Sequence, residues 1–110
     1  MTYTSIDWNA VWKDLSEKNI ECRGSGGCAA IWESKEKART YLERSQEEPE
    51  QTRCTIDGLP VKIESTVLDI GAGPGVLAVP LARRVARVTA VEPAAGMAEV
   101  MTEYARGEGV

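Results

Sequence analysis

The sequence predicts an α/β protein in which a helical front precedes a β-α-β-α rear. Three observations support this: helix-spaced apolar residues dominate residues 1–60, two short runs rich in β-branched residues follow at 66–70 and 88–91, and a glycine-rich turn directly follows the first run. Strand-helix-strand connections are right-handed, so the two strands should be parallel neighbours. We expect residues 1–60 to form an N-terminal helical segment and residues 61–110 to begin an α/β domain.

The first predicted helix runs from about Asp7 to Lys18, with Ser5 or Asp7 as its N-cap. A loop or hinge follows at 23–27, because three glycines in four residues disfavour a helix. The front also carries three tryptophans, whose large apolar areas favour anchoring on the α/β layer over lining a ligand lid. They are Trp8, Trp12 and Trp32.

A second helix is predicted from about Ala29 to Glu48, with Glu33 and Lys37 at the spacing of an ion pair. Pro49 ends it and occupies the first position of a short third helix over residues 49–57, closed by Gly58. A hairpin turn at Asp57-Gly58 is the alternative for this segment.

The rear begins with a strand at 66–70, whose apolar run is typical of a strand buried on both faces. A break at Gly71–Gly75 leads into a helix from Val76 to about Arg84, with Pro80 near its first turns.

The second strand is predicted at 88–91, and the last helix extends to Arg106, where Gly107 ends it. Core packing is the favoured role for the apolar residues that this helix repeats at helical spacing. They are Met97, Val100 and Met101.

Size and charge limit the functions that fit. The chain has 110 residues, 43% of them hydrophobic and 27% charged, with a net charge of -4, which is typical of a soluble protein with one core. The mild acidity indicates no nucleic-acid partner, and no apolar run is long enough to span a membrane. With no histidine, no C-x-x-C pair and no signal sequence, we expect no metal site and a cytoplasmic location.

The strand, glycine turn and helix predict a polar-ligand site over residues 71–75. Glycines allow close backbone approach, and a helix N-terminus offers free N–H groups and partial positive charge. Glu92, at the end of the second strand, is placed to accept hydrogen bonds from both hydroxyls of a ribose. The pattern therefore predicts a nucleoside-bearing cofactor. It departs from the dinucleotide fingerprint, because Val76 stands where the third glycine belongs.

The segment Val67–Gly75 (VLDIGAGPG) closely resembles motif I of the class I S-adenosylmethionine-dependent methyltransferases, and residues 88–93 (VTAVEP) resemble the acidic stretch that follows it. The resemblance covers about residues 61–110 and implies the start of a Rossmann-like methyltransferase sheet, incomplete here, with S-adenosyl-L-methionine as cofactor. It assigns cofactor-binding roles at the matching positions: Asp69 at the methionyl amino group, the backbone of Gly71, Ala72 and Gly73 beside the methionyl part, Glu92 at the ribose hydroxyls, and Pro93 and Met97 against the adenine. Taken singly, the alternatives are structural: a tight turn, a helix cap and a solvated strand end.

We therefore expect the N-terminal, cofactor-binding portion of a methyltransferase, truncated and inactive as this fragment alone. Its methyl acceptor and catalytic residues cannot be assigned from the sequence. Two other classes stay open. One is a nucleotide-binding module of the NAD type. The other is a non-catalytic fragment that forms a homodimer or domain swap through its exposed strand edges.

Overall fold

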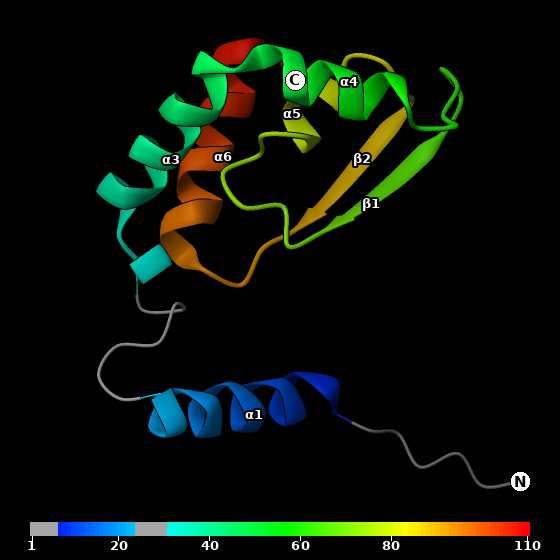
Figure 1. Cartoon of the computed structure of the whole chain (residues 1–110). Coiled ribbons are helices and arrows are strands. Elements are labelled where there is room, and N and C mark those ends of the chain that lie inside the picture. The colour runs from blue at the N-terminus through cyan, green and yellow to red at the C-terminus, as the bar shows by residue number, and fades with distance from the viewer. Residues whose placement is uncertain (1–6, 24–30) are drawn as a thin grey trace, which may run out of the picture. The chain divides into compact units, whose positions relative to one another are not determined.

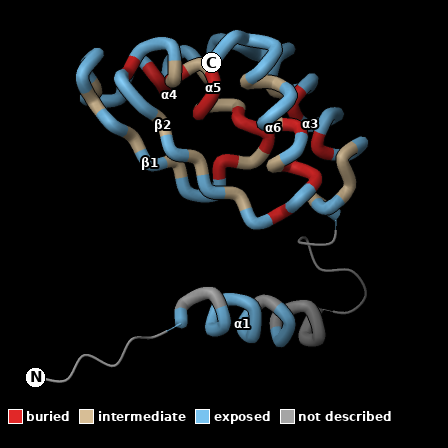
Figure 2. Tube along the Cα trace, turned by 180° about the vertical axis from the view of Figure 1, so that it is seen from behind, coloured by how far each residue is buried: buried red, intermediate tan, exposed pale blue. Residues whose placement is uncertain are grey.

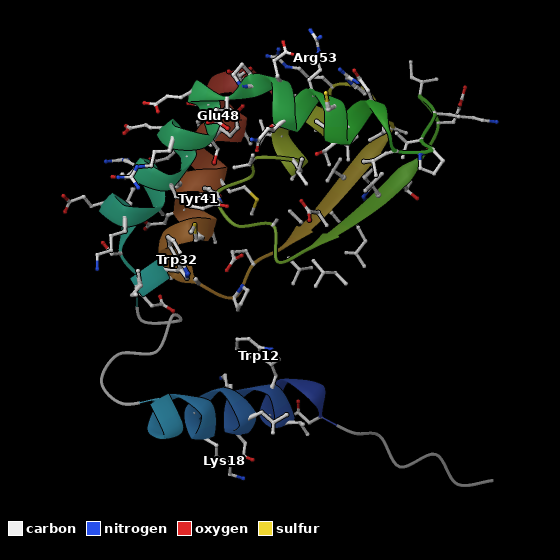
Figure 3. All side chains as sticks on the ribbon, viewed as in Figure 1. Trp12, Lys18, Trp32, Tyr41, Glu48 and Arg53 are labelled. Atoms are coloured by element: carbon white, nitrogen blue, oxygen red, sulfur yellow. The ribbon has the colours of Figure 1, made fainter. Side chains whose placement is uncertain are left out.

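The computed structural model describes residues 7–23 and 31–110, and the chain divides into two units, Met1–Ile31 and Trp32–Val110. The first unit contains helix α1 (Trp8–Arg23). Asp7 is its N-cap as predicted, since its Oδ1 accepts a hydrogen bond of 3.1 Å from the Ala10 N–H. The helix continues past the predicted end at Lys18. Trp12 is 51% exposed (Figure 3), and the predicted hinge beyond Arg23 lies outside the described residues.

All other described elements belong to the second unit (Figure 1). The predicted division of the chain after residue 60 stays a prediction. None of the described helices is long and apolar enough to cross a membrane.

Helix α3 (Lys35–Glu47) begins later than predicted, because Ser34 is its N-cap and accepts a hydrogen bond from the Lys37 N–H. Glu33 therefore precedes the helix, and the predicted Glu33–Lys37 ion pair is wrong. The Glu33 carboxylate instead accepts a hydrogen bond from the Ala95 N–H, 62 positions away.

The structure confirms the short helix α4 (Pro49–Asp57), with Pro49 in its first turn and Gly58 as its C-cap. The hairpin alternative is wrong. The Gly58 N–H donates to the Cys54 carbonyl, and the φ of -79° keeps Gly58 in the right-handed helical region.

Strands β1 (Thr66–Ile70) and β2 (Arg87–Val91) pair in parallel, with Thr66 opposite Arg87 and Ile70 opposite Val91. The predicted strands and their order are confirmed. This arrangement brings the carboxyl ends of both strands to one edge, where the glycine turn begins (Figure 1).

The two rear helices differ from prediction in length. Helix α5 (Ala78–Ala82) is much shorter than residues 76–84, because the preceding segment, up to Leu77, is occupied by turns that start in the glycine-rich stretch. Helix α6 (Ala95–Glu108) passes through Gly107 and is followed by Gly109, whose φ of +73° provides the left-handed C-cap.

Buried apolar side chains of the described residues form two clusters. The first joins α3 to α6, and the second joins α4 to α5 and to the helix-covered face of the sheet (Figure 2). Trp32 packs against the first cluster and meets Tyr41 edge to face at 5.5 Å between ring centroids, so this tryptophan anchors α3 as predicted. The buried members are Ala38, Leu42, Ala94, Met97 and Val100 in the first cluster, and Ile56, Leu81 and Val85 in the second.

The sheet is not buried on both faces, and that prediction is wrong. Val67 and Val88 pack against the second cluster, whereas Leu68, Ile70 and Val91 are 59%, 76% and 47% exposed on the opposite face. Side chains alternate along a strand, and the helices of the second unit cover only one side. The apolar run of β1 therefore supplies one packed face and one bare face.

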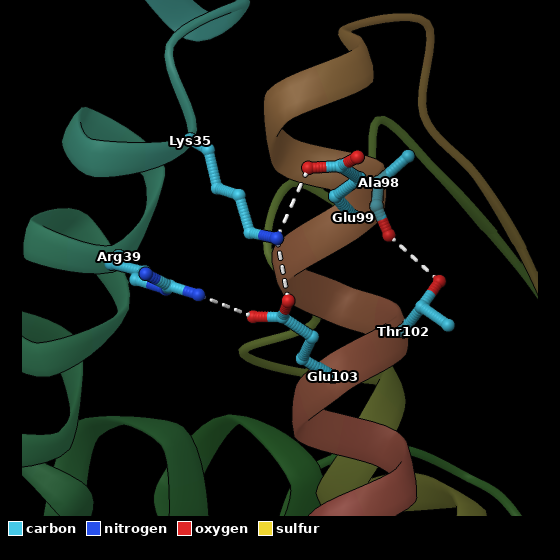
Figure 4. Close-up of polar contacts among 6 residues, drawn as sticks. All are labelled: Lys35, Arg39, Ala98, Glu99, Thr102 and Glu103. Carbon is cyan, nitrogen blue, oxygen red and sulfur yellow. Dashed lines mark hydrogen bonds and ion pairs between the residues drawn. The ribbon is translucent and has the colours of Figure 1, made fainter.

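An ion-pair cluster joins α3 to α6. The Lys35 Nζ lies 2.5 Å and the Arg39 Nη2 2.9 Å from the carboxylate of Glu103, and Lys35 also contacts Glu99 at 3.2 Å (Figure 4). Hydrogen bonds from Lys35 and then Arg39 lower the pKa of Glu103 to about 2. All of these side chains are well exposed, so we expect a small stabilisation.

The cluster predicts a specific loss of stability in acid. Because the pKa of Glu103 falls from 4.5 to about 2 on folding, its contribution is complete above pH 4.5 and disappears as the pH drops toward 2. Urea midpoints measured across this range should fall more for the wild type than for Glu103→Gln. Glu64→Gln, an exposed position outside the cluster, is the control and should follow the wild type. Parallel curves for wild type and Glu103→Gln would contradict the assignment.

Candidate cofactor site

The glycine turn is fixed to the end of β2 by its own backbone. The N–H groups of Gly71 and Ala72 both donate to the Val91 carbonyl, at 2.8 and 3.1 Å. Gly71 and Gly73 have φ angles of +75° and +57°, a region that residues with a Cβ adopt only at a cost. The turn therefore depends on glycine at these positions.

Glu92 closes the site from the other strand. Its Oε2 accepts a hydrogen bond from the Gly73 N–H at 2.8 Å, and its Oε1 accepts one from the Ala94 N–H, also at 2.8 Å. One half-buried carboxylate thus joins the turn after β1 to the start of α6. Each carboxylate oxygen has two lone pairs, so both can still accept a bond from a ligand hydroxyl.

The glycines differ in what surrounds them. A Cβ added to Gly71 or Gly73 would meet no atom of the described residues within 4 Å, whereas a Cβ on Gly75 would lie 2.8 Å from side-chain atoms of Met101 and Val79. Gly71 and Gly73 therefore border open space that a ligand can approach closely. At Gly75, the missing side chain leaves room for the side chains of α6 and α5 to pack against the turn.

Asp69 lies on the helix-covered side of β1, two residues before the turn. Burial raises the pKa of its carboxyl group above the usual value, because desolvation disfavours the charged form. Within the described parts of the chain, no salt bridge or hydrogen bond compensates this carboxylate. A cationic ligand group placed beside it would relieve that cost.

The other predicted site residues lie as follows. Ala72 is buried at the start of the turn, and Pro93 is exposed directly after Glu92. Met97 is 5% exposed and belongs to the first core cluster. The structure thus brings the turn and Glu92 into direct contact, while the Met97 side chain packs in the core.

A hollow of about 520 Å³ lies beside the end of the turn. Val76 and Leu77 form one wall. Polar side chains of α3 and α4, among them Tyr41 and Arg44, line the rest together with Glu48, which lies between the two helices. Figure 3 labels Tyr41 on α3 and Glu48 between α3 and α4. The hollow borders the segment that follows the turn, and neither the turn glycines nor Glu92 line it.

Sequence reasoning did not assign Glu33 to this region. Its carboxylate reaches the first residue of α6, and the Ala94 N–H immediately before it is held by Glu92. No local spacing relates positions 33 and 95, so only the packing of α3 on α6 reveals the contact.

Taken together, a parallel β-α-β unit, a glycine turn open to a ligand and an acid at the next strand end form the arrangement that cofactor-binding α/β folds use. Comparison with known proteins specifies the class. Residues 67–110 match the family model described as a methyltransferase domain. No curated protein sequence matches the chain.

One solved structure has a similar fold. It is a crystal structure from Methanococcus maripaludis, described provisionally as an S-adenosyl-L-methionine-dependent methyltransferase, with a TM-score of 0.56 and 23% sequence identity. The similarity covers 70% of this chain but only 37% of that one. The chain therefore resembles the class I methyltransferases, and its fold matches part of their Rossmann-like sheet.

Proposed function

We propose that this chain is the cofactor-binding portion of an S-adenosylmethionine-dependent methyltransferase. The observation that carries the proposal is the hydrogen bond between the Glu92 carboxylate and the glycine turn, at a place where the turn borders open space. Both lie in the segment that the methyltransferase-domain model matches. The cofactor supplies an activated methyl group on a sulfonium centre, and the protein supplies binding and orientation. The turn and its two acids fit such a molecule, because it carries a ribose and an ammonium group.

The proposed roles follow the contacts. Glu92 would accept hydrogen bonds from the ribose hydroxyls through its remaining lone pairs, and Asp69, whose pKa burial raises, would pair with the methionyl amino group. The remaining positions would border the ligand through backbone or apolar surface. They are Gly71, Ala72 and Gly73 beside the methionyl part, and Pro93 on the adenine side, whereas the Met97 side chain, 5% exposed, packs in the core.

The proposal concerns cofactor binding. We do not expect methyl transfer by residues 1–110 alone, because the described sheet has two strands and the chain matches 37% of the similar structure. The methyl acceptor is not assigned. A cytoplasmic location and pairing with a second copy through the strand edges stay predictions.

Calorimetric titration of the full chain tests the proposal. We expect S-adenosylhomocysteine, the demethylated cofactor, to bind and NAD to bind more weakly, because Val76 replaces the third glycine of the dinucleotide fingerprint. Tighter binding of NAD would favour the nucleotide-module alternative and overturn the proposal. Binding of neither ligand would favour the non-catalytic alternative.

A further inference from the structure

We propose that Glu33 is a positioning residue for the nucleoside side of the site. This inference rests on the proposed function for its ligand, but its structural basis is independent. The Glu33 Oε2 accepts a hydrogen bond of 3.1 Å from the Ala95 N–H, at the first residue of α6. Helix α6 has no side-chain cap of its own, because its N-cap residue is Ala94. Glu33 thus supplies, from a distant segment, an acceptor for one of the N–H groups that a helix leaves unpaired at its N-terminus.

The backbone around Glu33 also fits tightly against α6. A Cβ added to Gly96 would lie 2.5 Å from the carbonyl oxygen of Glu33 and 2.8 Å from the carbonyl carbon of Ser34. Gly96 is buried and has an ordinary helical position, so the glycine is required by this close approach. The entry to α3 and the first turn of α6 therefore form one rigid contact.

This contact continues to the glycine turn. Glu33 holds Ala95, and Glu92 holds the neighbouring Ala94 with one oxygen and Gly73 with the other. Two carboxylates on consecutive N–H groups at a helix N-terminus are also favoured by the helix dipole. The arrangement fixes the Glu92 carboxylate between α6 and the turn, in the position proposed to receive the ribose.

Hydrogen exchange of the ligand-free chain tests the positioning. In Glu33→Ala the exchange rate of the Ala95 amide should rise about fivefold, the equivalent of a lost helix cap. Glu33→Gln keeps an acceptor oxygen and should restore most of the protection. Glu43→Ala, an exposed position on α3, should leave the Ala95 amide unchanged. Unchanged Ala95 exchange in Glu33→Ala would overturn the proposal.

Ligand affinity tests the functional part. Glu33→Ala should raise the Kd of adenosine and of S-adenosylhomocysteine by the same factor, about fivefold, because both share the nucleoside. Asp69→Asn should weaken only S-adenosylhomocysteine, which carries the amino group. An unchanged adenosine Kd in Glu33→Ala would overturn the role at the nucleoside.

A second variant changes the α6 side of the contact between α6 and the backbone around Glu33. Gly96→Ala should raise both Kd values and increase Ala95 exchange, whereas Gly107→Ala in the same helix should do neither, since its Cβ would meet no described atom within 4 Å. If the wild type binds no S-adenosylhomocysteine, the proposed function fails, and the ligand-free exchange data still decide whether Glu33 positions α6.

Discussion

Glu92→Ala is expected to raise the Kd for S-adenosylhomocysteine about a hundredfold, because it removes the acceptor of two backbone hydrogen bonds together with the proposed ribose contact. The Gly73 and Ala94 N–H groups would lose a charged partner at a half-buried position. We expect the free energy of unfolding to fall by about 2–4 kcal/mol for the same reason. Calorimetric titration and urea unfolding measure the two effects.

Two further variants separate binding from stability. Glu92→Gln keeps one acceptor oxygen but presents an amide NH₂ to the other N–H group, so it should lie between the wild type and Glu92→Ala in both measurements. Glu64→Ala removes an exposed carboxylate outside the site and should match the wild type. Wild-type affinity in Glu92→Ala would contradict the role of Glu92 in the site.

The rear of the fold could be predicted because its signals are local. The β-branched runs mark β1 and β2, and the alternating glycines between residues 70 and 76 mark the turn whose φ angles require them. Glu92 was predicted from its place after β2. Its hydrogen bonds to Gly73 and Ala94 were not, since they depend on how the strand ends come together.

The errors arose where distant contacts determine local structure. Gly107 predicts a helix end, but α6 continues to Glu108, whose carbonyl oxygen and carboxylate both contact the Arg83 guanidinium. Glu33 fits an ion pair with Lys37 by spacing, but Ser34 caps α3 and leaves Glu33 free to reach Ala95. No short-range pattern contains these partners.

The bare sheet face has a similar cause. Most residues of β1 are uncharged on both faces of the strand. This composition does not show which element covers each face. Leu68 and Ile70 stay exposed because the helices of the second unit pack only on the side of Val67. Burial on two faces requires a second layer, and a strand's own composition cannot show whether one is present.

Gly75→Ala is expected to be the most destabilising change in the turn. Its φ of +87° disfavours any residue with a Cβ, and the new methyl group would lie 2.8 Å from Met101 Cγ and from Val79 Cγ2. Strain and overpacking together should lower the free energy of unfolding by about 2–4 kcal/mol. The midpoint of thermal unfolding should fall by roughly 10 °C or more.

Gly73→Ala is the matched comparison, because it has the same class of backbone conformation without the packing conflict. Its φ of +57° predicts a cost of about 1–2 kcal/mol from strain alone. Its methyl group would project into the open space where the methionyl part is proposed to pass, so the Kd for S-adenosylhomocysteine should rise on the order of tenfold. The two variants should therefore differ in which property they affect more. Gly75→Ala should lose more stability, and Gly73→Ala should lose more affinity relative to the stability that it loses. If Gly73→Ala binds as tightly as the wild type, the ligand does not approach the turn at this position, and the open space beside Gly73 has no part in binding.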